Sequence, residues 1–190
     1  MITIRKAEDN DLEAVAKLLV KSFSHSLSFL GANAEVIVSK SIRAKGFYVA
    51  EQGRIIGVVA LSDCNSSAIQ LDKRAMKSCL GALKGTILSI FAAREIKPKV
   101  ILADSEAFID AVAIDEEFRG NGIAKQMIEH ILTQNKYDAV FLEVLDANAA
   151  AISSYRKCGF RELSRKRVRL ATSYKYKIIM ECRAIKNIGF

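Results

Sequence analysis

The fold of this chain is decided by one stretch, Phe108-Ile-Asp-Ala-Val-Ala-Ile-Asp-Glu-Glu-Phe-Arg-Gly-Asn-Gly-Ile-Ala-Lys-Gln-Met-Ile-Glu-His-Ile131. The apolar run up to Ile114 has the composition of a strand. Alternation would place Phe108, Asp110, Val112 and Ile114 on one face and Ile109, Ala111 and Ala113 on the other. Further on, apolar residues recur at helical spacing, at Ile123, Met127, Ile128 and Ile131. The stretch therefore predicts a strand, a tight turn and a helix that begins near Gly122.

The turn in this stretch, Arg119-Gly120-Asn121-Gly122-Ile123-Ala124, has the chemistry of an anion-binding site. Its two glycines let the backbone turn tightly and approach a ligand without Cβ atoms in the way. The first N–H groups of the following helix lack helical partners, and the helix dipole places about half a positive charge there. It is not a Walker loop, and Lys125 stands where a dinucleotide fingerprint needs glycine. Alone, the turn fits either a pyrophosphate-binding loop or a helix cap that binds nothing.

The composition is that of one globular α/β domain spanning residues 1–190. Hydrophobic residues make up 51% and charged residues 26% of the chain, which is ordinary for a folded protein of this size. Four scattered cysteines and two histidines support neither a metal site nor a disulfide framework, so free thiols in a reducing cytoplasm are expected. We expect no signal peptide ahead of the strand-like residues 2–6, and no apolar run is long enough to span a membrane.

The formal net charge of +8 is unevenly distributed. Residues 151–190 contain eleven Lys or Arg against only Glu162 and Glu181. Such a basic segment attracts anions, which could be a phosphorylated cofactor, an acidic protein or nucleic acid.

The N-terminal half predicts a strand and a helix followed by a hairpin. Residues 2–6 are expected to form the strand, and residues 12–23 an amphipathic helix after the acidic start Asp9-Asn10-Asp11. A second helix is expected over residues 34–44, with Val36, Ile37 and Ile42 buried. The runs 47–51 and 54–62 predict two strands joined by a tight turn at Gln52-Gly53.

Residues 66–91 interrupt the strand pattern with apolar residues at helical intervals: Met76, Cys79, Leu80, Leu83, Ile87, Ile90 and Phe91. We expect a helix or a helix pair packed on the sheet, and Gly81 and Gly85 argue against one continuous rod. A basic amphipathic segment could instead contact a membrane or a partner. The only proline, Pro98, then marks a return to the sheet near residues 99–103.

After the opening stretch, residues 139–144 predict a strand parallel to the one before it, because a strand–helix–strand unit of this length returns in the same direction. An alanine-rich helix is expected over residues 148–158, with Asn148, Ile152 and Tyr155 on one face and Gly159 as its left-handed cap. Residues 160–163 and 174–183 predict two closing antiparallel strands, joined through the basic segment 164–173.

Two motifs in this region resemble those of the GNAT superfamily of N-acetyltransferases. Arg119-x-x-Gly122-x-Ala124 is similar to that family's pyrophosphate loop. Leu142-Glu-Val144 followed by Asn148-x-x-Ala151-x-x-x-Tyr155-x-x-x-Gly159-Phe160 is similar to its next strand and helix, and locally to the branch that acetylates protein N-termini. The resemblance implies a mixed, mostly antiparallel α/β (α+β) sheet flanked by helices, with two parallel central strands that splay apart. The helical segment near residues 66–98 would be an insert into that fold.

The resemblance also implies acetyl-coenzyme A (acetyl-CoA) as co-substrate. Its pantetheine would lie between the splayed strands against the backbone of Val112, Ala113 and Ile114. The N–H groups of Arg119, Gly120, Asn121, Gly122, Ile123 and Ala124 would hold its pyrophosphate, and Asn148 would reach its pantetheine arm. The reaction implied is direct attack of a primary amine on the thioester in a ternary complex.

The same resemblance makes Tyr155 the proton donor to the departing thiolate, or a tyrosine that only forms a hydrogen bond beside the cofactor. Glu143 is the expected base in the branch that acetylates N-termini, and Asp110 competes because it would project beside the cleft. A water chain ending at either carboxylate, or a merely solvated Glu143, stays open.

The sequence does not identify the acceptor. Small molecules, peptide or protein N-termini and polyamines are all compatible with it, and homodimer formation is undecided. A membrane partner is not expected. A non-catalytic acyl-CoA sensor is a second hypothesis, and a ribosome- or nucleic-acid-associated protein using residues 165–177 is a less favoured third.

Overall fold

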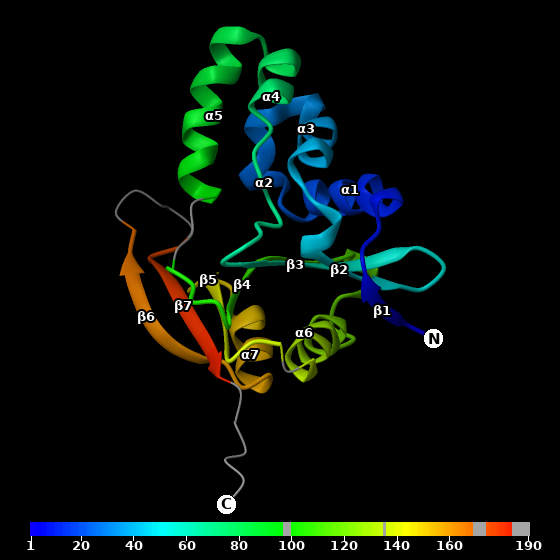
Figure 1. Cartoon of the computed structure of the whole chain (residues 1–190), viewed down its shortest axis with the longest axis vertical. Helices are drawn as coiled ribbons and strands as arrows, with labels where there is room; N and C mark the ends of the chain where they lie inside the picture. The colour runs from blue at the N-terminus through cyan, green and yellow to red at the C-terminus, as the bar shows by residue number, and fades with distance from the viewer. Residues whose placement is uncertain (97–99, 135, 169–173, 184–190) are drawn as a thin grey trace, which may run out of the picture.

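The computed structural model describes residues 1–96, 100–134, 136–168 and 174–183 (Figure 1). One seven-stranded sheet runs through the molecule in the order β1-β2-β3-β4-β5-β7-β6. The strands are β1 Thr3–Lys6, β2 Phe47–Glu51, β3 Ile55–Asp63, β4 Glu106–Ile114, β5 Ala139–Leu145, β6 Arg161–Arg167 and β7 Tyr176–Arg183. The helices are α1 Leu12–Ser22, α2 Ser24–Leu27, α3 Ala34–Ser41, α4 Lys73–Leu80, α5 Ala82–Ile96, α6 Ile123–Thr133 and α7 Ala149–Lys157. Short 3-10 turns are η1 Asp9–Asp11, η2 Ser28–Asn33, η3 Ala44–Gly46 and η4 Glu116–Phe118.

The helices lie on both faces of the sheet. Figure 1 shows α1 to α5 on one face, which we call the α1 face, and α6 and α7 on the other, which we call the α6 face. Each face has its own core of buried apolar side chains. Val15 and Leu19 of α1 pack on the α1 face, whereas Met127 and Ile128 of α6 pack on the α6 face. The sheet is antiparallel except for the β4–β5 pair, so the predicted parallel relation of these strands is confirmed.

The strand–helix–hairpin opening is confirmed, and local chemistry explains it. A capping box between Glu8 and Asp11 fixes the turn ahead of α1. The hairpin of β2 and β3 turns through Gly53, whose φ of 70° suits glycine far better than other residues. The predicted helix after the glycine turn is also correct, because Ile123, Met127, Ile128 and Ile131 are the buried residues of α6.

The helical insert differs from its prediction. It forms a pair, α4 and α5, but the pair packs on η2 and α3 rather than on the sheet, with Met76 buried beside Ile37. Figure 1 shows α5 standing away from the strands. Consequently Leu83, Ile87 and Ile90 are exposed, although the helical spacing suggested burial.

Two further boundaries were wrong. Helix α3 ends at Ser41, and Val36 is 47% exposed because its side of the helix faces solvent. Residues 100–103 form no strand, and the return to the sheet begins at Glu106. Pro98 and Lys99 lie outside the described residues.

The closing strands are antiparallel as expected, but β6 continues to Arg167, so part of the basic segment is strand. Every residue of β6 is exposed, since it is an edge strand that carries five charged side chains in seven residues.

Candidate active site

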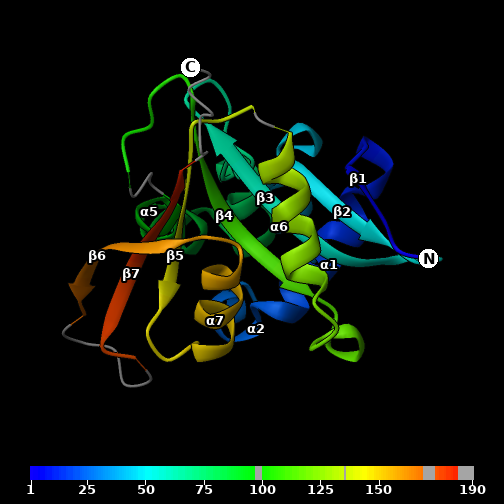
Figure 2. The same ribbon diagram turned by 90° about the horizontal axis from the view of Figure 1, so that it is seen from below.

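The central feature of the sheet is an opening between β4 and β5. The two strands pair only from Glu106↔Ala139 to Ile109↔Leu142. Beyond these residues they diverge, and Figure 2 shows the gap widening toward α6 and α7. Among the described strands, none therefore lies beside the edge of β4 from Asp110 onward on its β5 side, as the splay prediction required. Val112, Ala113 and Ile114 lie along this edge and pair only with β3.

A β-bulge lies where the opening begins. In the β3–β4 ladder Ala60 pairs with Ala111 and Leu61 with Ile109, so Asp110 is the extra residue. The bulge reverses the alternation predicted for β4. Val112 and Ile114 belong to the α6 face with Ile109, whereas Asp110 and Ala111 both line a pocket on the α1 face. The prediction that Asp110 shares a face with Val112 and Ile114 was therefore wrong.

The glycine turn follows β4 on the α6 face. Gly120 and Gly122 have φ values of 82° and 73°, and nothing lies within 4 Å of an added Cβ at either position. The backbone N–H groups from Gly120 to Ala124 donate to no other described residue. Together with the start of the eleven-residue helix α6, these N–H groups are placed to donate hydrogen bonds to an anion.

The arginine of the turn has a structural contact of its own. Its Nε donates to the carbonyl of Ile114 over 3.1 Å, and its guanidinium lies 3.5 Å from Glu116. Arg119 thus ties the turn back to the end of β4. The backbone of the turn, rather than this side chain, remains the better candidate for holding a pyrophosphate.

Asp115 is an anchor for this turn that sequence reasoning missed. Its buried carboxylate accepts from Arg54 and from Lys21, and its backbone N–H donates to Ile56. The Arg54 hydrogen bond lowers the pKa of Asp115 to about 2, so the anchor is ionised at neutral pH. No local motif marks it, because its partners stand far away in the sequence.

Tyr155 and Asn148 come from the helix that follows β5. Tyr155 is 9% exposed beside Phe160, and its hydroxyl has no hydrogen-bond partner among the described residues. Burial, with the nearby Cys158, raises its pKa to about 12, so the phenol keeps its proton throughout the neutral range. Asn148 is exposed and caps α7, its Oδ1 accepting from the N–H of Ala151.

The carboxylate of Asp110 lies on the opposite face of the opening. Water reaches it, but the walls of the pocket surround it, and this partial desolvation raises its pKa to about 6. Ser62 of β3 donates to one of its oxygens, and the same hydroxyl accepts from the N–H of Ala68. Sequence reasoning missed Ser62, whose position in an apolar strand carried no signal.

Glu143, on β5, shares the α1 face with Asp110. Its neighbours Leu142 and Val144 belong to the α6 face, so alternation turns Glu143 the other way. Its Oε1 lies 3.5 Å from Nζ of Lys177, and its side chain is 22% exposed. The opening thus has a phenol and a turn with unpaired N–H donors on one face and two carboxylates on the other.

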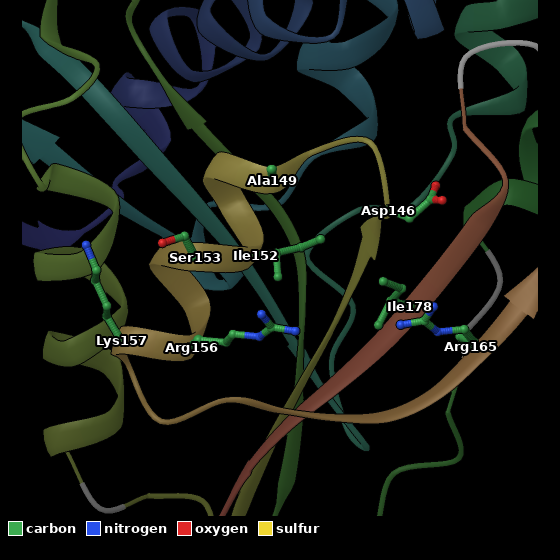
Figure 3. Close-up of a pocket in the computed structure, with 8 residues that line it drawn as sticks. All are labelled: Asp146, Ala149, Ile152, Ser153, Arg156, Lys157, Arg165 and Ile178. Carbon is green, nitrogen blue, oxygen red and sulfur yellow. The ribbon is translucent and has the colours of Figure 1, made fainter.

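Two hollows flank this arrangement. The apolar pocket, of about 360 Å³, lies on the α1 face and includes Asp110. The larger hollow, of about 600 Å³, lies between α7 and the β6–β7 hairpin (Figure 3). Its lining residues are Asp146, Ala149, Ile152, Ser153, Arg156, Lys157, Arg165 and Ile178, and none of them is a predicted site residue. Asp146 already accepts from the backbone of Lys175 and Tyr176, and Arg165 forms two bonds of 2.7 Å to Glu162.

The structure is that of a mixed α/β protein whose seven-stranded sheet opens between two parallel strands. Comparison with known proteins gives the family. Residues 12–160 match the acetyltransferase (GNAT) family, and the chain belongs to it. The predicted family, fold class and enzyme class are confirmed by this match.

Individual relatives are more distant. A [ribosomal protein bS18]-alanine N-acetyltransferase from Salmonella typhimurium is 34% identical over 65 residues, which are 33% of this chain and 44% of that protein. The matched segment therefore spans less than half of the relative. The crystal structure of the ribosomal-protein-S18-alanine N-acetyltransferase from Escherichia coli superposes with a TM-score of 0.59 at 18% identity, covering 100% of both chains. A chain of the NatC complex bound to Gag peptide and CoA gives 0.56 at 15% identity, covering 96% of this chain and 98% of that one.

Acetyl-CoA is the acetyl donor of the family, and the site has groups that fit it. The turn offers unpaired N–H donors for a pyrophosphate, and the edge of β4 has no neighbouring strand where an extended chain would lie. In the described part of the chain, no helix is both long and apolar enough to cross a membrane.

Proposed function

We propose that this protein transfers the acetyl group of acetyl-CoA to the nitrogen of a primary amine by direct attack in a ternary complex. The observation that carries the proposal is the opening between β4 and β5, which puts an anion-binding turn and Tyr155 on one face and Asp110 on the other. Donor and acceptor could therefore approach the same point from opposite sides of the sheet.

On the α6 face, the chain's task would be to bind and orient the co-substrate. The N–H groups from Gly120 to Ala124 would hold the pyrophosphate. The free edge of β4 from Val112 to Ile114 would pair with the pantetheine as an added strand pairs with a sheet edge. Asn148 stands at the start of α7, where its side chain would have to leave its capping bond to reach the pantetheine.

Acetyl-CoA supplies the activated acetyl group, and the amine must lose a proton to attack it. We assign the proton acceptor to Asp110 rather than Glu143. A base works best when its pKa is near the working pH, and Asp110 has a pKa of about 6. Glu143 instead has a charge partner, because its Oε1 lies 3.5 Å from Nζ of Lys177.

Ser62 would hold the Asp110 carboxylate toward the opening through its hydrogen bond. Tyr155 would donate to the departing sulfur from the α6 face. Its phenol is protonated at neutral pH and has no competing partner among the described side chains. With a pKa of about 12 it would act mainly as a hydrogen-bond donor to the developing thiolate.

The acceptor would be the amine of a small molecule or of a peptide or protein N-terminus. Support for an N-terminus comes from the Salmonella relative, whose name specifies an alanine of a ribosomal protein. The family match alone favours neither class of acceptor.

The test combines calorimetry with a coenzyme A release assay. We expect acetyl-CoA to bind and at least one amine to be acetylated in a panel of N-terminal peptides, small amines and polyamines. Failure to bind either acetyl-CoA or CoA would refute the proposal. If the wild-type protein binds acetyl-CoA but acetylates no amine, and if Tyr155→Phe and Asp110→Asn bind acetyl-CoA with unchanged affinity, the protein would be an acyl-CoA sensor instead.

A further inference from the structure

The apolar pocket on the α1 face ends at the reaction centre proposed above. It has a volume of about 360 Å³ and lies beneath α1, α2, η2 and α3, with the two bulge residues Asp110 and Ala111 in its wall. Because the bulge turns two consecutive side chains toward the same space, the carboxylate and the apolar wall belong to one cavity.

The chemistry of the lining is almost uniformly apolar. Sixteen described residues line the pocket, and only Ser26, Ser41 and Asp110 are polar. The hydroxyl of Ser41 already donates to Ile37 and accepts from the N–H of Asp72, so it offers little to a ligand. Ser26 is exposed on the short helix α2. Asp110 is thus the one charged group of the described lining, and its second oxygen has no hydrogen-bond partner among the described residues.

We propose that this pocket takes an acceptor whose primary amine is attached to a bulky apolar group, such as a leucine, methionine or phenylalanine side chain or an arylalkyl chain. The amine would lie at Asp110 and the apolar group would fill the cavity. The inference rests on the proposed function, because it specifies the acceptor of the same site.

Size and charge both favour this class of acceptor. A pocket of about 360 Å³ is within the range that holds small ligands. The methyl group of an alanine would leave most of its apolar surface uncovered, whereas a large side chain would cover it. A polyamine would put further ammonium groups among apolar walls, where the described lining has no second carboxylate to pair with them.

The first experiment compares acceptors on the wild-type protein. Matched peptides would begin with Ala, Ser, Leu, Met or Phe, and the free amines would be phenethylamine, hexylamine and spermidine. We expect kcat/KM to be about 10- to 100-fold higher for the bulky apolar members than for the Ala peptide or spermidine. Peptides and free amines form separate arms, so the same data tell a protein N-terminus from a small molecule.

The second experiment changes the pocket. Val38 of α3 lines it and is half buried, whereas Val36, two residues earlier on the same helix, is exposed and does not. We expect Val38→Phe to lower kcat/KM at least 10-fold for the Leu, Met and Phe peptides while the Ala peptide loses much less. Val36→Phe should leave every value within about twofold, because its ring would lie in solvent.

Leu27→Ala provides an independent variant in case Val38→Phe folds poorly. Leu27 lines the pocket from α2, so its truncation should move the preference toward the largest apolar acceptor. Equal activity on Ala and Leu peptides, or a preference that neither variant changes, would overturn the pocket assignment while leaving the acetyltransferase intact. Absence of acetyl-CoA binding and of turnover on every amine would instead refute the proposed function, and this inference with it.

Discussion

The two strands that border the opening each carry one carboxylate on the same face of the sheet, yet the two acids are in opposite situations. Asp110 on β4 stands at a bulge in an apolar pocket, where partial desolvation raises its pKa to about 6. Glu143 on β5 stands in a regular ladder, 3.5 Å from the ammonium group of Lys177. One acid is held where a proton can be gained and lost near neutral pH, and the other where its charge is compensated.

The difference shows that position beside a cleft does not define a catalytic role. The sequence makes both Asp110 and Glu143 candidates for the general base. Only the surroundings of each carboxylate in the structure distinguish the two candidates. A backbone irregularity of a single residue puts Asp110 among apolar walls, whereas regular pairing leaves Glu143 next to a lysine on β7. The predictions below test this contrast, from the largest expected effect to the smallest.

Replacing Asp110 with Asn should lower kcat/KM about 10²- to 10³-fold at pH 7.5, since it removes the proton acceptor but keeps a group that can accept from Ser62. Wild-type kcat/KM should rise through a limb near pH 6 as the carboxylate ionises, and Asp110→Asn should lose that limb. Steady-state kinetics between pH 5 and 9 measures both.

Glu143→Gln is the matched control on the other strand, and it should change kcat/KM less than about fivefold, because Glu143 is a charge partner rather than the base in this proposal. If Glu143→Gln were the more damaging change, or if the limb near pH 6 persisted in Asp110→Asn, the assignment of the base would be reversed.

Tyr155→Phe tests the contribution of α7, the helix that follows β5. Removing the hydroxyl should lower kcat about 10- to 100-fold and leave the Kd of acetyl-CoA within about threefold, because the phenol would act on the departing sulfur rather than on binding. Single-turnover rates with calorimetry separate these quantities. A loss confined to KM would mean that Tyr155 only positions the co-substrate.

Gly122→Ala tests the β4 side through its glycine turn. A Cβ at a φ of 73° is strained and would stand where a pyrophosphate would approach, so the Kd of acetyl-CoA should rise about 10-fold. Gly81→Ala is the control. Gly81 has a φ of 83° and equally open surroundings, and it ends α4, a helix that packs on η2 and α3 rather than beside the glycine turn. Equal effects of the two substitutions on Kd would show that strain, rather than ligand approach, is responsible.

The same two strands show which parts of the fold and of the site could be predicted from the sequence. Periodicity and glycine chemistry were enough for the β4 strand, the turn and α6, because those signals are local. The bulge at Asp110 depends on register against β3, so alternation alone put its side chain on the wrong face. Ser62 and Asp115 act through partners distant in sequence, and the position of α4 and α5 depends on contacts with α3. Family resemblance supplied the cofactor hypothesis but no acceptor, since most of the pocket proposed for the acceptor is built from helices that lie outside the two motifs.

The smallest expected effect concerns stability, and it separates the role of Asp110 from simple damage to the fold. A carboxyl whose pKa is raised by folding binds more protons in the folded state than in the unfolded state, between its ordinary pKa near 4 and the folded value near 6. The contribution of Asp110 to the free energy of unfolding therefore decreases as pH rises from about 4 to about 6. Above pH 6 the ionised carboxylate destabilises the folded state. Asp110→Asn should consequently raise Tm at pH 8 by only about 1–2 °C, because water still reaches the carboxylate, and should leave Tm unchanged at pH 4. Scanning calorimetry at the two pH values measures the difference. A Tm that drops at pH 8 would mean that the carboxylate stabilises the bulge, and the loss of activity in Asp110→Asn would then have a structural cause.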